Sequence, residues 1–517
     1  MLNTSKSVRT AGFMMAAVFT AKISGMLRDI IIASIYGTSA EAAAYSSASL
    51  ILVYFFDIGI TAAVSSVFIP VFNEYLEKGE KQKAHEFSNT FLNIVLITSV
   101  IITFFGMLAA RPIVSLIAGG LIHDTYILAV QLVRILFPML IFAGTAFTFV
   151  AILQSYDEFT IPSIISLASN LIIIIYLIFW NKHFGIYGLA VATVVGWVAQ
   201  AFVQVPSLIK KGYRYRPIIN LKNTGIKKAG ILVLPFLIST WVQPINALVN
   251  IHLASWLNEG RAVVALDYAH RVYLIIVGVF TYTLSNLIFP SLSRTNTSTN
   301  KEQFTALIRN SLNTVLYFVT PLMTGFIILR RPIIKLIYER GAFDSFSTEL
   351  TSKALLYLSI GMVGFAVKEI MNKAYFATQD ARTPMKVSVL GILVNIALSI
   401  ILSKTMGLAG IALASSIASI LIAVLLVFFM QRRYGGIFDK KNLWNYSKTL
   451  TASLVMGIIV YFLHSYFTKN IITSTILVKL LAVAIPGLTG IAVYIPLTLL
   501  MGLDMARLPF KIFKKDP

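Results

Sequence analysis

The chain of 517 residues contains no cysteine, which excludes a disulfide framework and a thiolate metal site. Its six histidines are scattered without the spacing of metal ligands, so we expect neither a metal nor another cofactor. It also lacks a Gly-Lys-Ser/Thr phosphate loop, a His-Glu-x-x-His pair and a Gly-x-Ser-x-Gly elbow. The sequence therefore predicts a protein that is not an enzyme. Any work that it performs must be driven by a gradient, by a membrane potential or by downstream consumption of its product.

Charged residues are also scarce. They make up 12% of the chain, whereas hydrophobic residues make up 57%, and the mean hydropathy is +0.81. This composition is that of an integral membrane protein and not of a soluble domain. The net charge of +22 would suggest nucleic acid in a soluble protein. Here the basic residues gather in alternate loops, so we expect no nucleic-acid partner.

Apolar segments of span length recur along the whole chain. We count about fourteen, each near the 20 residues that a membrane helix needs, which predicts an all-α integral membrane protein. Because short loops rich in Lys and Arg stay cytoplasmic, both termini are expected in the cytoplasm. The basic loop at 330–340 is an exception, since this topology places it on the outer side. The first apolar stretch lacks a cleavage site and is expected to be a retained helix. The loop cations that indicate this orientation are Lys78, Lys81 and Lys83 after the second span, Lys210, Lys211, Arg214, Arg216, Lys222, Lys227 and Lys228 after the sixth, and Arg432, Arg433, Lys440, Lys441 and Lys448 after the twelfth.

The two halves of the chain repeat one another. Residues 153–190 and 375–412 align without a gap at an offset of 222, which pairs Pro162 with Pro384 and Gly185 with Gly407. An even number of spans per repeat gives both repeats the same orientation in the membrane. We therefore predict a six-helix bundle over 1–215, a pseudo-symmetric six-helix bundle over 216–435, and two further helices with a cytoplasmic tail over 436–517.

The first apolar stretch carries charges where a bilayer should expel them. Lys22, Arg28 and Asp29 lie among apolar residues, with Ser24 and Gly25 between them. A charge at bilayer depth costs from about 2.5 to more than 10 kcal/mol, so such residues usually face a bundle interior or a wet cavity. On a helix Lys22 and Asp29 share one face, and Gly25 leaves room for the backbone to open. The pattern predicts the lining of a substrate cavity.

Two further charges fall inside predicted spans. Arg271 lies about two turns into the eighth span; it either lines the cavity or snorkels outward along its own stem. Asp57 is near the centre of the second span, where it is either half of an ion pair, a protonatable site or a neutral packed acid. We keep both as candidates.

Several motifs resemble one known family. They are Lys22-Ile-Ser-Gly-Met-Leu-Arg-Asp-Ile, Val67-Phe-Ile-Pro-Val-Phe-Asn-Glu-Tyr, Val242-Gln-Pro-Ile-Asn-Ala-Leu-Val-Asn, Tyr268-Ala-His-Arg-Val, Phe289-Pro-Ser-Leu-Ser, Glu339-Arg-Gly-Ala-Phe-Asp and Tyr375-Phe-Ala-Thr-Gln-Asp-Ala-Arg-Thr-Pro-Met-Lys-Val. Together they look like the MurJ (MviN) lipid II flippases of the MOP exporter superfamily. The resemblance implies a multi-pass protein of the bacterial cytoplasmic membrane that moves lipid II from the inner to the outer leaflet by alternating access. It also implies a role in cell-wall biogenesis, with lipid II, membrane lipids and cell-wall synthesis proteins as partners, and a lipid-tail groove on the last two helices.

Carried onto this chain, the resemblance matches Arg28 and Arg271 to cavity arginines and places Lys22 where most members have arginine. Where the family has a further arginine in its second span, this chain has Phe56. A cation site of some members needs acids where this chain has Asn250 and Ser399, near a retained Asn395. The resemblance therefore predicts transport driven by membrane potential without sodium coupling.

Two other functions stay open at this stage. A multidrug or cation antiporter of the same superfamily would use membrane acids such as Asp29 and Asp57, although a basic cavity repels cationic drugs. A flippase for another polyprenyl-linked glycan would share every feature named above. A purely structural membrane protein fits poorly with buried charge and internal duplication.

Overall fold

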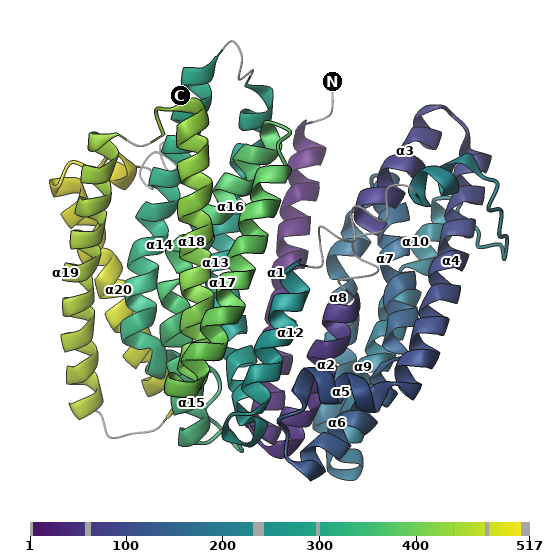
Figure 1. Cartoon of the computed structure of the whole chain (residues 1–517), viewed down its shortest axis with the longest axis horizontal. Coiled ribbons are helices and arrows are strands. Elements are labelled where there is room, and N and C mark those ends of the chain that lie inside the picture. The colour runs from purple at the N-terminus through teal and green to yellow at the C-terminus, as the bar shows by residue number, and fades with distance from the viewer. Residues whose placement is uncertain are drawn as a thin grey trace. The chain divides into compact units, whose positions relative to one another are not determined.

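The computed structural model describes residues 4–56, 64–230, 242–295, 300–437, 439–470 and 475–507. Over these ranges the chain forms helices and no strand, so the predicted all-α class is confirmed (Figure 1). The chain divides into two compact units, Met1–Val264 and Ala265–Pro517. The predicted bundle boundaries at 215 and 435 stay a prediction, since a unit of packing and a unit of repetition need not end at the same residue.

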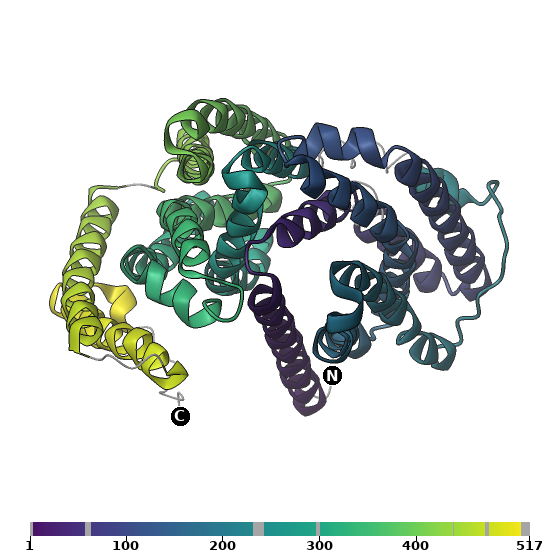
Figure 2. The same ribbon diagram turned by 90° about the horizontal axis from the view of Figure 1, so that it is seen from below.

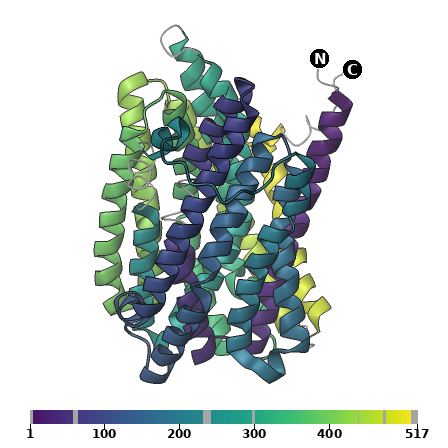
Figure 3. The same ribbon diagram turned by 90° about the vertical axis from the view of Figure 1, so that its right-hand side faces the viewer.

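The first unit consists of helices that run alongside one another (Figure 3). Helix α1 packs on α8, α8 on α9, and α2 on α6. The last helix, α12, packs on α2 and α5, where Gly120 N donates to Ser255 Oγ at 3.1 Å. Its helices are α1 Thr4–Tyr36, α2 Ala40–Phe56, the π-helix η2 Val64–Phe68, α3 Ile69–Glu77, α4 Lys81–Leu108, α5 Ala110–Ala118, α6 His123–Leu136, α7 Met139–Ser155, α8 Thr160–Phe179, α9 Asn181–Phe202, α10 Val205–Lys210, α12 Val242–Ser255 and the 3-10 turn η3 Asn258–Gly260.

The second unit contains the chain's longest helices. Helices α17 and α18 form the most extensive pair, while α19 and α20 pack on each other and on α14 (Figure 2). A small apolar core around Tyr317, Met456 and Tyr494 joins these last three. The helices are α13 Arg261–Arg294, which begins at the unit boundary, α14 Lys301–Ile337, α15 Ser345–Ile360, α16 Met362–Ala377, α17 Arg382–Met406, α18 Leu408–Tyr434, α19 Lys440–Asn470, α20 Ile476–Leu500 and the 3-10 turn η4 Asp504–Arg507.

The helices have the length and hydropathy of membrane spans. Within the described ranges eight helices pass this test, and two bent pairs, α6 with α7 and α15 with α16, raise the number to ten if each pair is one span. The pairs bend by 42° and 47°. A multi-pass membrane protein is thus confirmed, whereas the total of fourteen spans stays a prediction.

The backbone repeats at the offset found in the sequence. Asp157 and Gln379, which are 222 residues apart, both have positive φ, at 56° and 60°. Gly185 and Gly407 have the same offset and nearly the same conformation, φ 51° and ψ −143° against φ 58° and ψ −132°. Each glycine marks the kink at which one long helix gives way to the next. A shared unusual backbone at matched positions supports the internal duplication.

These two glycines offer a test of the repeat. A Cβ at either would meet no atom within 4 Å, so the cost of Gly→Ala comes from the backbone alone. A side chain in such a sparsely populated conformation costs of order 1–3 kcal/mol. We expect Gly185→Ala and Gly407→Ala to lower the Tm of the purified protein by similar amounts. Gly325→Ala, in the open middle of α14, is the control and should leave the Tm unchanged or raise it.

One motif shared with the family organises the turn between α14 and α15. Arg340 Nη2 donates to the carbonyls of Leu336 and Ile337 at 2.6 and 2.8 Å, which closes the end of α14. Asp344 then caps α15 by accepting from Ser347 N at 2.8 Å. Each contact satisfies a helix-end group that has no partner inside its helix. The Arg-Gly-Ala-Phe-Asp motif therefore shapes a turn.

The Gln-Asp-x-x-Thr-Pro motif acts in the same way before α17. Asp380 accepts from Thr383 N at 3.1 Å and from Thr383 Oγ1 at 2.8 Å, and Arg433 Nη1 donates to it at 3.0 Å. Burial by itself would raise the pKa of Asp380, but these hydrogen bonds and the Arg433 charge hold that pKa below its usual value. The motif ties α17 to the end of α18.

Candidate functional site

A polar network crosses the interface of α1 and α8 among apolar side chains. Arg28 Nη1 donates to Asn170 Oδ1 at 3.0 Å, and Asn170 Nδ2 donates to Ser24 Oγ at 2.9 Å and to the carbonyl of Ala21 at 3.3 Å. Ser24 Oγ also donates to the Ala21 carbonyl at 2.8 Å. Ser24 and Arg28 are one helical turn apart, which places both on the face of α1 that meets Asn170. The side chains of Arg28, Ser24 and Asn170 thus form one network with the backbone carbonyl of Ala21.

Arg28 also forms an ion pair with its neighbour. Its Nε and Nη2 donate to the same oxygen of Asp29, at 3.0 and 2.8 Å. The side chains of Arg28 and Asp29 are 24% and 14% exposed, so both charges are largely withdrawn from solvent. A charge in such a place needs a partner, because an unpaired one costs several kcal/mol, on the order of the 3–5 kcal/mol lost when a buried pair is broken. Asp29 supplies that partner here.

The two other candidates on α1 differ from one another. A Cβ at Gly25 would lie 3.4 Å from Asn170 Nδ2, an ordinary van der Waals distance, so Gly25 packs beside the network. Lys22 is exposed and makes no hydrogen bond or ion pair with the residues that the structure describes. Gly25 therefore serves packing, whereas Lys22 presents a cation.

Asn170 is the functional candidate that the sequence interpretation missed. It is 4% exposed and lies in the mainly apolar helix α8. The available signal was the pair Ser169-Asn170 at the middle of a predicted span, since a polar side chain at that depth is costly unless it has a partner. Ser169 accepts from Gln200 Nε2 at 2.9 Å, which extends the polar face to α9.

We expect Asn170→Leu to damage both stability and transport. The change removes three hydrogen bonds and leaves Arg28 Nη1 without its acceptor, which costs about 1–3 kcal/mol for a withdrawn polar group. The Tm of the purified protein should fall, and transport should fall with it. Asn170→Asp keeps the acceptor for Arg28 and should retain more transport than Asn170→Leu. Equal activity of Asn170→Leu and wild type would show that the network does not position Arg28.

Arg271, in the second unit, also pairs with a carboxylate. Its Nε and Nη2 donate to Asp267 Oδ2 at 3.1 and 3.0 Å, one turn earlier on α13. The Arg271 side chain is 35% exposed and that of Asp267 is 12% exposed. Each candidate arginine therefore has its own carboxylate partner on the same helix.

The residues tied to ion coupling are neutral where the structure describes them. Asn395 and Ser399, both buried in α17, share a hydrogen bond of 3.0 Å from Ser399 Oγ to Asn395 Oδ1. Asn250 lies in α12, and Asp57 lies outside the described residues. In the described ranges no group of three or more His, Cys, Asp or Glu side chains is placed to hold a metal ion.

Two arginine–carboxylate pairs that are only partly exposed thus lie on helices of a multi-pass membrane protein. An inward-facing MATE multidrug transporter of the MOP superfamily matches with a TM-score of 0.69 over 83% of this chain and 98% of that one, at 14% identity. Identity this low shows that the two chains share a fold and nothing more. A lipid II flippase MurJ in an inward closed conformation matches with a TM-score of 0.79 and 26% identity, over 94% of this chain and 98% of that one.

Sequence comparisons identify the branch. The family profile described as lipid II flippase MurJ matches residues 32–482, and the chain belongs to that family. A probable lipid II flippase MurJ of Vibrio cholerae is 26% identical, with 98% of each chain covered. The lipid II flippase MurJ of Thermosipho africanus is 29% identical over 88% of this chain and 90% of its own.

Proposed function

We propose that this chain moves lipid II from the inner to the outer leaflet of the bacterial cytoplasmic membrane. The family match over residues 32–482 supports this function most directly. The ion-paired arginines held inside apolar helices are the structural counterpart, because an anionic headgroup needs cations along its path. The work is transport and requires no covalent chemistry by the protein.

We assign binding of the substrate pyrophosphate to Arg28. A guanidinium has five N–H donors, and the hydrogen bonds of Arg28 to Asp29 and Asn170 use three of them. Two donors therefore stay available, and arginine suits phosphate oxygens because its planar fork donates two parallel charge-assisted hydrogen bonds. Lys22, six residues earlier on α1, adds a second positive charge, while Ser24, Gly25 and Asn170 fix the geometry.

Asp29 gives Arg28 a partner when no substrate is bound. An unpaired guanidinium in an apolar helix is unfavourable, so Asp29 stabilises the empty state. A pyrophosphate with about two negative charges competes with a single carboxylate for the same donors. Exchange of one anion for the other lets Arg28 bind and release the headgroup while its guanidinium always has an anionic partner.

Arg271 is assigned the same role by the same reasoning within its own unit. Asp267 takes the place of Asp29, with two nitrogen atoms of Arg271 on one carboxylate oxygen. Asp57, Asn250 and Asn395 remain proposals for ion pairing or coupling. Alternating access, cytoplasmic termini and contacts with cell-wall synthesis proteins are also proposals.

The test is complementation of a bacterium whose own lipid II flippase can be depleted. Expression of this chain should restore growth and should restore the appearance of lipid II headgroups on the outer face of the membrane, detected with an impermeant reagent. Growth without outward lipid II would contradict the proposal. Outward movement of a different polyprenyl-linked glycan, or drug resistance without headgroup export, would favour one of the two alternative functions.

A further inference from the structure

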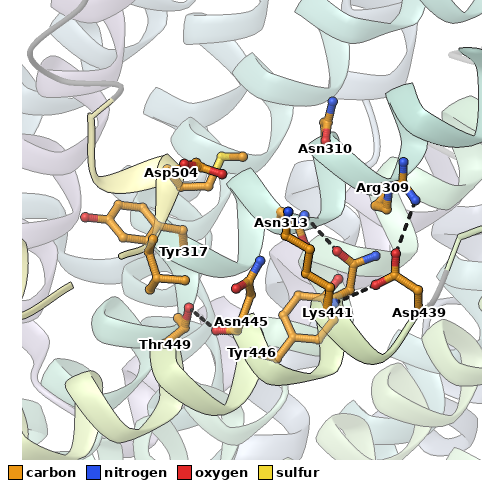
Figure 4. A pocket seen from close by; sticks show the side chains of 13 residues that line it. Arg309, Asn310, Asn313, Tyr317, Asp439, Lys441, Asn445, Tyr446, Thr449 and Asp504 are labelled. Carbon is orange, nitrogen blue, oxygen red and sulfur yellow. Dashed lines mark hydrogen bonds and ion pairs between the residues drawn. The ribbon is translucent and has the colours of Figure 1, made fainter. Parts of the chain in front are cut away.

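A polar pocket in the second unit lies at one end of α14, α19 and the turn η4. It encloses a volume of about 340 Å³, within the size range of ligand pockets. Figure 4 shows its side chains, which lie on α14, on the first turns of α19 and in the turn after α20. The residues that carry the argument are Arg309, Asn313, Asp439, Lys441, Asn445 and Asp504.

Several contacts across this pocket are long, although Asp439 Oδ1 caps α19 by accepting from Asn442 N at 2.7 Å. Arg309 Nη1 lies 3.4 Å from Asp439 Oδ2, and Asn313 Nδ2 lies 3.4 Å from Asn442 Oδ1, both at the long limit of a hydrogen bond. Asn313 Oδ1 is buried and has no hydrogen-bond partner among the described residues. Since buried polar atoms in native proteins nearly always have partners, these groups indicate a polar guest.

Neighbouring side chains place the pocket at the depth of lipid headgroups. Trp444 is 62% exposed on the outer side of α19, and Lys448 Nζ lies 5.9 Å from the centroid of its ring. Lys448 Nζ also donates to the carbonyl of Met501 at 2.7 Å, at the end of α20. Exposed Trp and Lys at the end of a membrane helix mark the interface between hydrocarbon and water. Leu443 and Leu450, 66% and 47% exposed, offer an apolar surface beside the pocket for acyl chains.

The lining is charged but balanced. Arg309 and Lys441 contribute two cations, and Asp439 and Asp504 contribute two carboxylates. A purely anionic headgroup would be repelled by the carboxylates, and a purely cationic ligand would be repelled by the cations. A zwitterion with a phosphate and an ammonium group fits both pairs. The Asn445 amide offers N–H donors to phosphate oxygens, and Asn313 Oδ1 offers an acceptor to the ammonium group.

We infer that this pocket binds the headgroup of a zwitterionic aminophospholipid. Arg309 and Lys441 hold the phosphate, and Asp439 and Asp504 accept hydrogen bonds from the ammonium group. The phosphate replaces the long contact between Arg309 and Asp439. The positive loop residues before α19 place this end of the helices at the cytoplasmic leaflet. This site is independent of lipid II transport, because none of its residues belongs to the proposed transport site.

The experiment compares two lipids that share a phosphate and differ only at the amine. The purified full-length protein is titrated with phosphatidylethanolamine or phosphatidylcholine in mixed micelles, and bound lipid is counted by native mass spectrometry. Phosphatidylethanolamine should bind at least about tenfold more tightly, because a quaternary amine has no N–H to donate to the carboxylates. Equal binding of the two lipids would overturn the inference. Tighter binding of phosphatidylglycerol, titrated in the same way as a lipid with a phosphate and no amine, would overturn it too.

Variants locate the binding on the pocket. Asp504→Asn should remove most of the preference for phosphatidylethanolamine, because Asp504 accepts from the ammonium group. Lys441→Gln should weaken the binding of both lipids, because both carry the phosphate that Lys441 holds. Lys440→Gln is the matched control, since Lys440 is the exposed neighbour of Lys441 and does not line the pocket. Asn313→Leu fills the pocket with an apolar side chain and should abolish the preference too. A preference that survives both Asp504→Asn and Asn313→Leu would contradict the assignment.

A last arm separates a lipid from its soluble headgroup. O-phosphoethanolamine carries the same phosphate and ammonium groups without acyl chains. It should compete only at concentrations far above those of the lipid. Competition at equal concentration would show a site for a soluble zwitterion and would overturn the lipid assignment. Transport assays of the pocket variants keep the two proposals apart, because Lys441→Gln should still move lipid II.

Discussion

Replacing Arg28 by alanine should abolish growth of a cell that depends on this chain for its flippase. The variant loses the donors assigned to the pyrophosphate. Hydrogen bonds to a charged group contribute about 1.5–3 kcal/mol each, so the loss of even one corresponds to roughly tenfold or more in affinity. The measurements are complementation and the rate at which lipid II headgroups reach the outer face. Arg28→Lys keeps the charge but loses the planar fork, and it should be severely impaired as well.

Stability must be separated from function in this test. Arg28→Ala leaves the Asp29 carboxylate without its cation, and breaking a buried pair in this way costs about 3–5 kcal/mol, less here because Arg28 is 24% exposed. The double variant Arg28→Ala/Asp29→Ala removes both charges and should recover stability without recovering transport. Arg111→Ala, which changes an exposed arginine on α5, is the control for loss of charge alone. Normal growth with Arg28→Ala would refute the assignment of the pyrophosphate to this residue.

The sequence predicts Arg28 and Asp29 well, because their chemistry is local. Two charges in an apolar helix require a polar environment whatever the rest of the chain does. Asn170 is different, since it lies 142 residues from Arg28 and only packing brings α8 against α1. A single Asn in a predicted span signals that a partner exists, but not which one. Its role became visible only from the distance between the two side chains.

The repeat shows the same division between what is local and what is not. The offset of 222 between Gly185 and Gly407 can be found in the sequence, but their matching backbone angles are seen only in the structure.

The polar pocket shows more sharply what the sequence cannot predict. Its residues lie on α14, at the start of α19 and in the turn after α20, and the sequence of each segment by itself shows only polar residues. Their meeting is a property of helix packing.

The last prediction concerns the energy source for transport. A headgroup with about two negative charges is driven outward by an inside-negative potential, and each charge that crosses the full field gains about 2.3 kcal/mol per 100 mV. Asn395 and Ser399 are neutral and hydrogen-bonded to one another, whereas hard cations such as sodium favour carboxylate oxygen. We therefore expect transport to depend on membrane potential and to be insensitive to a sodium gradient.

The measurement uses proteoliposomes that carry the purified protein and lipid II. Collapse of a potassium diffusion potential with an ionophore should slow headgroup export several-fold, because about two charges then lose a drive of roughly 5 kcal/mol per 100 mV. Removal of sodium at constant potential should leave the rate unchanged. The protonophore control, with the potential clamped by potassium, tests whether a proton gradient contributes. If removal of sodium alone stops export, the chain holds a cation site that its neutral α17 pair does not reveal, and Asp29 and Asn395 are the first residues to replace.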